Sequence, residues 1–396
     1  MDEIAPLTDS LTFGIGCYSF EAPDADLLLM QNPDGSYSIH DWARDVEQAL
    51  RSIPSLDNIV VTGFRTVRGD SPSTWRNFGD GSKHFSDEKG LHRGGDLRPH
   101  PVGGRIQFDV RIPLHVQENV FSWGTALQGT KFEVDIRYGQ GMPVAFVRAA
   151  DVETHPSMAV AVVREFLRSE FDARLAANPI TFTIMGPSPM WNDCFLRWTQ
   201  DQQERFVEVQ VEKTPGYGQV TFLVKRSSQG RTLEDAYDRL KDGLEEELNL
   251  YYEMVSRNAV LHVRRSHVEY ELGELVANHQ SSGLGAWLWR RFKGERNTNN
   301  LLLEILALDS EHKRALGNVR GEWEEIRNRS LAHAFDAAFE REFEKPDFDH
   351  TENAKSVALL LSERLSRETQ VLVVIVSSLL GGVIGAALTA LVQVGG

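Results

Sequence analysis

Residues 105–116 read RIQFDVRIPLHV, and two more short apolar or alternating segments follow at 131–138 (KFEVDIRY) and 143–149 (PVAFVRA). Alternation of apolar and polar residues predicts half-buried strands. Because these patterns follow one another without a helical pattern between them, they favour a mixed or partly antiparallel sheet. Outside them, the same criteria predict strands at 11–20, 58–64, 180–185, 205–212 and 219–225 and helices at 41–52 and 156–176. Residues 1–230 therefore predict an α/β domain.

A long polar, glycine-rich stretch at 62–104 interrupts this pattern and predicts a flexible loop. It contains His84, His92 and His100 at intervals of eight residues, near several carboxylates. Two or three histidines with a carboxylate can bind zinc, but this spacing fits neither one helix face nor a tight ligand hairpin. We interpret them as solvated loop histidines, and no metal site is predicted there.

Residues 231–370 have helical periodicity, with patterns at 232–279, about 299–345 and from about 351 onwards. In the second pattern, Leu316, Val319, Trp323 and Ile326 alternate steps of three and four residues, as in a coiled-coil seam. The chain from 231 to 370 therefore predicts a helical stalk. The expected fold class is a mixed-sheet α+β domain, then this stalk, then a single C-terminal transmembrane helix.

Residues 371–392 read VLVVIVSSLLGGVIGAALTALV and carry no charge. A helix of this length spans about 33 Å, which matches the hydrocarbon core of a bilayer. A buried core helix is the alternative, but it would normally show one polar face. Basic residues precede the segment, and the first ten residues lack the features of a signal peptide. We expect a single-pass C-terminal anchor in the lipid bilayer, with the N-terminal domain in the cytoplasm.

Small residues recur every four positions in this segment, at Ser377, Gly381, Gly385 and Thr389. Such rows let membrane helices approach closely, which favours packing between copies and a homo-oligomer. Small residues are also common in membrane helices in general, so this alternative stays open.

Composition excludes several classes of protein. The 396 residues include 42 Lys and Arg against 57 Asp and Glu, a net charge of −15, which argues against a general phosphate-backbone binder. Two cysteines, Cys17 and Cys194, are too few for a disulfide framework or a cysteine-rich zinc site. No phosphate-binding loop or nucleophile elbow occurs, and Gly14-Ile-Gly16 lacks the rest of a dinucleotide fingerprint. The sequence identifies no enzyme and predicts no cofactor.

Acidic residues cluster along the stalk at 245–247, 269–274, 322–325 and 340–344. Solvated helix faces explain such clusters, and a regulatory divalent-cation site is the open alternative.

Residues 287–293 (WLWRRFK) place Trp287 and Trp289 beside Arg290 and Arg291. This pattern is typical of a segment on a membrane surface, where indoles lie at the headgroups and cations meet anionic lipid. A hydrophobic plug between stalk helices is equally compatible with it.

Residues 362–376 (SERLSRETQVLVVIV) join the predicted stalk to the predicted span. This junction resembles that of CorA-type divalent-cation channels, in which an α/β cytoplasmic domain is followed by long helices that enter the membrane. The resemblance implies an oligomer that conducts ions. The second span and the Gly-Met-Asn signature of that family are absent from this sequence, so no functional residue is carried over.

Two strings in the predicted helices, Arg257-Asn258…His262 and Arg327-Asn328…His333, resemble the Arg-x4–6-His motif of HEPN ribonucleases. The resemblance implies a metal-independent ribonuclease in which histidine transfers protons and arginine stabilises the phosphorane. Five or six residues on one helix place the two side chains about 120–140° apart, so one helix alone would not assemble the site. A surface arginine and a hydrogen-bonded histidine are the simpler interpretation, and nucleic acid is a partner only under the ribonuclease hypothesis.

These patterns together predict a membrane-anchored sensor or effector. The α/β domain would detect an unidentified cytoplasmic ligand or protein and act through an oligomeric, pore-forming or ion-conducting membrane helix. A membrane-anchored HEPN-like ribonuclease is the alternative.

Overall fold

The computed structural model describes most of the sheet and the long helices, and it divides the chain into two compact units. Unit 1 comprises Met1–Val260 and Asn318–Lys345, and unit 2 comprises Leu261–Gly317 and Pro346–Gly396. The residues described are 10–21, 39–64, 103–120, 129–139, 142–150, 156–174, 180–185, 192–199, 207–214, 217–225, 232–281, 293–329, 335–344 and 353–363.

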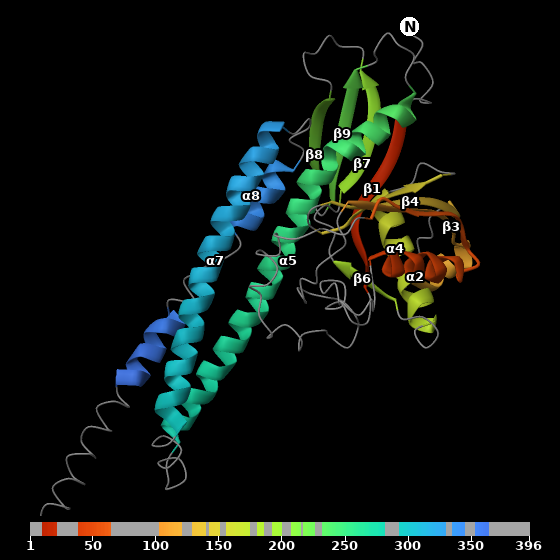
Figure 1. The fold of residues 1–396 in the computed structure, drawn as a ribbon. Helices are drawn as coiled ribbons and strands as arrows, with labels where there is room; N and C mark the ends of the chain where they lie inside the picture. The colour runs from red at the N-terminus through yellow and green to blue at the C-terminus, as the bar shows by residue number, and fades with distance from the viewer. Residues whose placement is uncertain are drawn as a thin grey trace, which may run out of the picture. The chain divides into compact units, whose positions relative to one another are not determined.

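The described strands of unit 1 form one mixed sheet of nine strands in the order β2-β3-β4-β5-β1-β7-β9-β8, with β6 paired to β1 (Figure 1). All pairs are antiparallel except β7 with β9. The strands are β1 (Ser10–Glu21), β2 (Leu56–Thr62), β3 (Gly104–Arg111), β4 (Lys131–Tyr138), β5 (Val144–Ala149), β6 (Thr181–Met185), β7 (Asn192–Thr199), β8 (Val207–Thr214) and β9 (Tyr217–Lys225). The α+β fold class with a mixed sheet is thus confirmed.

Strand β1 holds the sheet together because it pairs with three other strands. Its residues 10–13 pair with β7, 14–16 with β5 and 17–21 with β6.

Two details of the sheet differ from the sequence-based prediction. The strand predicted at 105–116 ends at Arg111, because Pro113 cannot donate a backbone hydrogen bond and its carbonyl instead accepts from Gln117 at the start of helix α3 (Leu114–Val120). Strand β7 was not predicted, although it lies between β1 and β9 and buries Cys194 and Leu196.

One face of the sheet is covered by helices α2 (Ile39–Arg51) and α4 (Pro156–Arg174). Every second residue of β3, from Ile106 to Val110, is buried there against a large apolar cluster that includes Trp42 of α2. Gly14 permits the close approach of α4, since a Cβ at this position would lie 2.3 Å from the Pro156 carbonyl oxygen. Helix α4 begins at Pro156, as predicted, and Asp193 of β7 accepts hydrogen bonds from Ser157 at its first turn.

Beyond residue 231 the described chain is helical, with α5 (Leu233–Gln280), α7 (Glu295–Arg329), α8 (Asp336–Glu344) and a helix over 353–363. The single helix predicted at about 299–345 is therefore two helices, α7 and α8. In unit 1, Trp323 of the predicted seam contacts Phe339 and Phe343 of α8, each with ring centroids 5.5 Å apart. In unit 2, α5, α7 and the 353–363 helix share an apolar cluster that includes Leu301, Ile305 and Ala358.

Among the residues that the structure describes, no helix is both long and apolar enough to cross a bilayer. The predicted membrane helix at 371–392 lies outside these residues, and so do most of the predicted loop at 62–104 and its three histidines. The predicted domain limits at 230 and 370 stay predictions.

Candidate functional site

The first part of α5 lies on the face of the sheet opposite α2 and α4. Thr232 and Asp235 begin this helix as a capping box: Asp235 N donates to Thr232 Oγ1 at 3.2 Å, and Thr232 N donates to Asp235 Oδ2 at 3.0 Å. Because side chains alternate along a strand, the residues between the apolar positions of β4, which pack under α2 and α4, point toward α5. These residues are charged, so α5 meets a charged surface.

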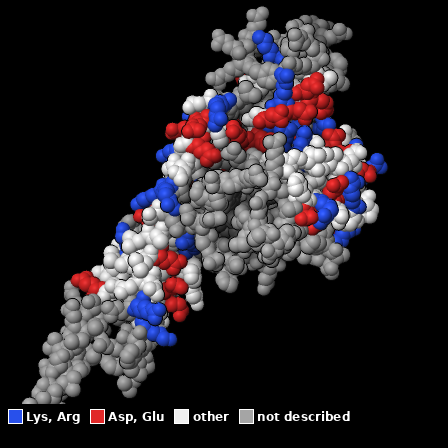
Figure 2. Space-filling model, viewed as in Figure 1, with Lys and Arg blue, Asp and Glu red and all other residues white. Residues whose placement is uncertain are grey.

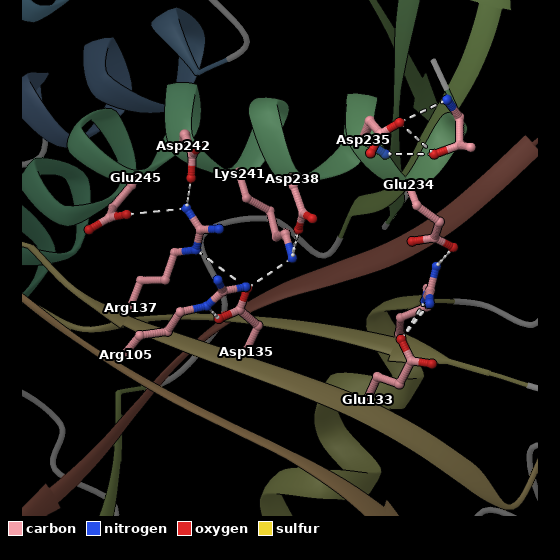
Figure 3. A network of polar contacts seen from close by, with 12 residues as sticks. Arg105, Glu133, Asp135, Arg137, Glu234, Asp235, Asp238, Lys241, Asp242 and Glu245 are labelled. Atoms are coloured by element: carbon pink, nitrogen blue, oxygen red, sulfur yellow. Dashed lines mark hydrogen bonds and ion pairs between the residues drawn. The ribbon is translucent and has the colours of Figure 1, made fainter. Parts of the chain in front are cut away.

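Asp135 of β4 is the centre of this surface (Figure 3). It is 6% exposed and accepts two hydrogen bonds from Arg105, both 2.6 Å long, and one from Lys241 Nζ of α5 at 2.9 Å. Burial alone would raise the pKa of Asp135, but Arg105, Lys241 and Arg137 together hold that pKa below its ordinary value. The carboxylate is therefore kept ionised by cations from two strands and one helix.

Arg137, two residues along β4, makes the second connection to α5. Its guanidinium pairs with Asp242 and lies 3.3 Å from Glu245 Oε2 (Figure 3). Burial would lower the pKa of Arg137, but Asp135, Asp242 and Glu245 raise it. Burial raises the pKa of Glu245 in spite of Arg137. Arg137 thus bridges the central carboxylate and the helix.

Apolar and cation–π contacts surround these ion pairs. Lys241 Nζ lies 4.3 Å from the centre of the Tyr237 ring, and this ring is 5.0 Å from that of Phe13 on β1. At the margin, Arg148 of β5 pairs with Glu133 and with the exposed Glu234 of α5. We call the ion pairs that join Arg105, Asp135, Arg137 and Arg148 of the strands to Glu234, Lys241, Asp242 and Glu245 of α5 the charged contact.

Further along α5, the Asn249 side chain packs closely against the residue that follows β4. Asn249 lies so near the end of β4 that a Cβ on Gly139 would be 1.9 Å from its Nδ2 atom. A larger residue at 139 would therefore displace the Asn249 side chain from its place against the strand end.

The charged contact has the chemistry of a docking contact between a helix and a sheet. Its cations and carboxylates satisfy one another, and no group of three potential metal ligands occurs among the described residues. Directional ion pairs of this kind fix the register of a helix on a sheet.

The first arginine–asparagine string is occupied by structural contacts. Arg257 is buried and pairs with Glu253 one turn earlier in α5. Asn258 Nδ2 donates to the backbone oxygen of Glu342 in α8 at 3.0 Å and to its Oε2 at 3.2 Å. His262 is exposed on α5.

In the second string, Arg327 Nε donates to Asp336 Oδ2 at 3.0 Å, and its guanidinium lies 5.1 Å from the Trp323 ring centre. Asn328 is exposed, and His333 lies outside the described residues. Both arginines thus have ion-pair partners in unit 1, and the ribonuclease hypothesis stays a prediction.

The structure describes only some of the residues of the other predicted sites. Trp287, Trp289, Arg290 and Arg291, and also Ser377, Gly381, Gly385 and Thr389, lie outside the described residues. The interpretation of the stalk carboxylates as solvated is wrong for Glu247 and Glu342, which are 2% and 4% exposed. They are buried because Glu247 accepts a hydrogen bond from the Phe335 backbone and Glu342 accepts one from Tyr251.

Comparison with known proteins gives no match: the chain matches no protein-family model, no curated protein and no solved structure.

The residues of the charged contact were not identified from the sequence, although a signal is present. Charged residues alternate with apolar ones in both β3 and β4, at Arg105, Asp109, Glu133, Asp135 and Arg137. A charged face on a strand in the middle of a sheet implies a charged partner, and the first turns of α5 supply one.

Proposed function

We propose that the protein is a membrane-anchored sensor or effector. In this proposal unit 1 binds a cytoplasmic ligand or protein, α5 carries the resulting change into unit 2, and a membrane helix at 371–392 assembles into an oligomer that permeabilises the bilayer. The uncharged segment of 22 residues supports the anchor, and the rows of small residues in it support the assembly.

One observation carries the proposal: α5 is a continuous helix of 48 residues that belongs to both units. Its first part is fixed to the sheet by the charged contact, and its last part shares the apolar cluster of unit 2 through Leu261, Val268 and Leu275. Because a helix transmits displacement without losing its hydrogen bonds, a change in the sheet that moves Asp135 or Arg137 is expected to reach unit 2.

Membrane attachment is tested by fractionation of the full chain and of a chain lacking residues 370–396. The full chain is expected in the membrane fraction after an alkaline carbonate wash, and the shortened chain in the supernatant. A full chain that fractionates as soluble would contradict the proposal.

Transmission along α5 is tested with Asp135→Asn in the full chain, and hydrogen exchange is measured at the amides of 261–280. Loss of the central carboxylate is expected to increase exchange there. Asp109→Asn is the matched control, because Asp109 lies on the same sheet and pairs there with Lys131 and Asn58. Unchanged exchange in the Asp135 variant, or an equal increase in the control, would contradict the proposed coupling between the sheet and unit 2 along α5.

A further inference from the structure

Unit 2 exposes large aliphatic side chains on two of its helices. Leu303 and Leu306 of α7 are 65% and 41% exposed. On the 353–363 helix, Leu359 and Leu360 are 47% and 66% exposed, and Val357 is 37% exposed. Exposed aliphatic groups in such number on neighbouring helices indicate an interaction surface.

The exposed residues around these side chains are almost free of charge. Between 299 and 310 of α7 the exposed positions are Asn299, Asn300, Leu303, Leu306, Ala307 and Ser310. On the 353–363 helix they are Asn353, Ser356, Val357, Leu359, Leu360 and Glu363. We call these residues, without Glu363, the uncharged face; Glu363 lies one turn along the helix from Leu359 and Leu360, and the half-buried Glu304 and Lys355 lie beside the face in sequence. One residue in four of the whole chain is charged, so this composition is unusual for a solvated surface.

The two helices present this face together. Ser362 Oγ donates to Asn299 Oδ1 at 3.2 Å, which holds the 353–363 helix beside the first turns of α7. Ala354 and Ala358 point inward to the apolar cluster, so the exposed leucines lie on the outside. Figure 2 shows a white area over this part of unit 2, with coloured atoms at its margins.

We infer that the uncharged face is the contact with a second copy of this chain, formed by unit 2 outside the bilayer. This contact is additional to any packing of the membrane helices.

Charge favours a second copy as the occupant. Each chain has a net charge of −15, so two copies repel each other over most of their surfaces. An uncharged aliphatic face lets like-charged copies approach, and a self-complementary patch of this kind suits a twofold contact.

The connection to the predicted membrane helix also favours a second copy, and this argument rests on the proposed function. Seven residues, 364–370, separate the 353–363 helix from the uncharged segment, and none of them is proline or glycine. They reach at most about 25 Å when fully extended. Copies whose membrane helices associate therefore hold their uncharged faces within a short distance of each other, which raises the effective concentration.

The test uses the full chain with Ser356→Cys, in native membranes, and a short bifunctional maleimide. Cys17 and Cys194 are buried, so the introduced thiol is the reactive one on this face. The Ser356→Cys protein is expected to crosslink to a dimer. Adding Leu303→Asp and Leu360→Asp should weaken association about tenfold or more, because the contact would then bury unpaired carboxylates.

Tyr270→Asp is the matched control: Tyr270 is 67% exposed in the same unit, but it lies on α5 between Glu269 and Glu271. It should leave crosslinking unchanged. The inference would be overturned if the variant with Leu303→Asp and Leu360→Asp crosslinked as much as the Ser356→Cys parent. An equal loss of crosslinking in the Tyr270→Asp control would also overturn it.

A fluorophore attached to the thiol that Ser356→Cys introduces tests whether lipid occupies this face instead. Quenching of the fluorophore by brominated lipid, without crosslinking to a dimer, would overturn the inference. Fractionation of the same samples keeps the two proposals separate. A soluble full chain that still crosslinks through the introduced thiol would refute the membrane anchor and leave the second-copy contact standing.

Discussion

The two faces of the sheet differ in the chemistry that joins them to their helices: both bury apolar side chains, but only the face under α5 adds a network of buried ion pairs. Under α2 and α4 the sheet buries an apolar cluster that contains Trp42, Phe108 and Ile136. Under α5, the same strands present Asp135, Arg137 and Arg105 to the charged residues of the helix.

This difference has a physical consequence for each helix. Apolar burial is non-directional and scales with area, so it holds α2 and α4 firmly under most solution conditions. Ion pairs are directional, and they weaken when a partner is protonated, displaced or screened by salt. The ion pairs of the charged contact are therefore the part of these helix–sheet contacts that a ligand or a change in conditions is expected to alter.

The largest effect is expected on the apolar face. Trp42→Ala removes a fully buried side chain that packs against Phe64 and Tyr138 and whose Nε1 donates to the Phe20 carbonyl at 3.3 Å. The free energy of unfolding should fall by about 4 kcal/mol. Denaturant unfolding at low and high salt should give the same loss, and a marked salt dependence would break the proposed contrast between the faces.

On the charged face, Asp135→Asn should lower the free energy of unfolding by about 3 kcal/mol, because Arg105, Arg137 and Lys241 lose their shared carboxylate. A double-mutant cycle with Lys241→Met measures the coupling directly. The loss in the double variant should be well below the sum of the two single losses. Additive losses would show that the Lys241–Asp135 pair does not contribute to the docking of α5.

The pH dependence of this face has a definite sign. The folded-state pKa of Asp135 lies below that of the unfolded chain, so its contribution to stability is present above about pH 3.9 and is lost as the pH falls through the lower folded-state value. Acid titration of the free energy of unfolding should therefore be less steep in Asp135→Asn than in the parent below about pH 3.9. If the free energy of unfolding of the parent and of Asp135→Asn fell equally steeply below this pH, the lowered pKa of Asp135 would be refuted.

The smallest effect is expected at the margin of the charged contact. Glu234 is 60% exposed where it pairs with Arg148, and exposed pairs contribute less than about 1 kcal/mol. Glu234→Gln should change the free energy of unfolding within this limit, and added salt of about 0.5 M should abolish the difference. A loss as large as that of Asp135→Asn would mean that burial does not separate the centre from the margin.

Much of the sheet could be predicted from the sequence because its strands show regular patterns. Strand β4 has the predicted limits, 131–138, since every second residue of it is apolar. Strand β7 was missed because Asp193 and Arg197 obscure its apolar positions. The break between α7 and α8 was missed because periodicity continues through it, and packing on Trp323 decides where α8 lies.

The charged contact could not be predicted residue by residue, since it joins positions about 100 residues apart. The distance in sequence between Asp135 and Lys241 leaves no local signal that they form a pair. Glu245 was noted only as one of several clustered carboxylates, and its role depends on Arg137. Long-range pairing of charges is a property of the fold.

The three partners of β1 also determine when the sheet can form during synthesis. Residues 10–13 pair with β7, whose strand ends at Thr199, so the ribosome must add nearly the whole of unit 1's sheet before β1 is fully paired. At about 5–20 residues per second this takes roughly 10–40 s. Throughout that interval the apolar segment LTFGIGCYSF has unpaired edges, and the nascent chain is then most prone to aggregate and most in need of a chaperone.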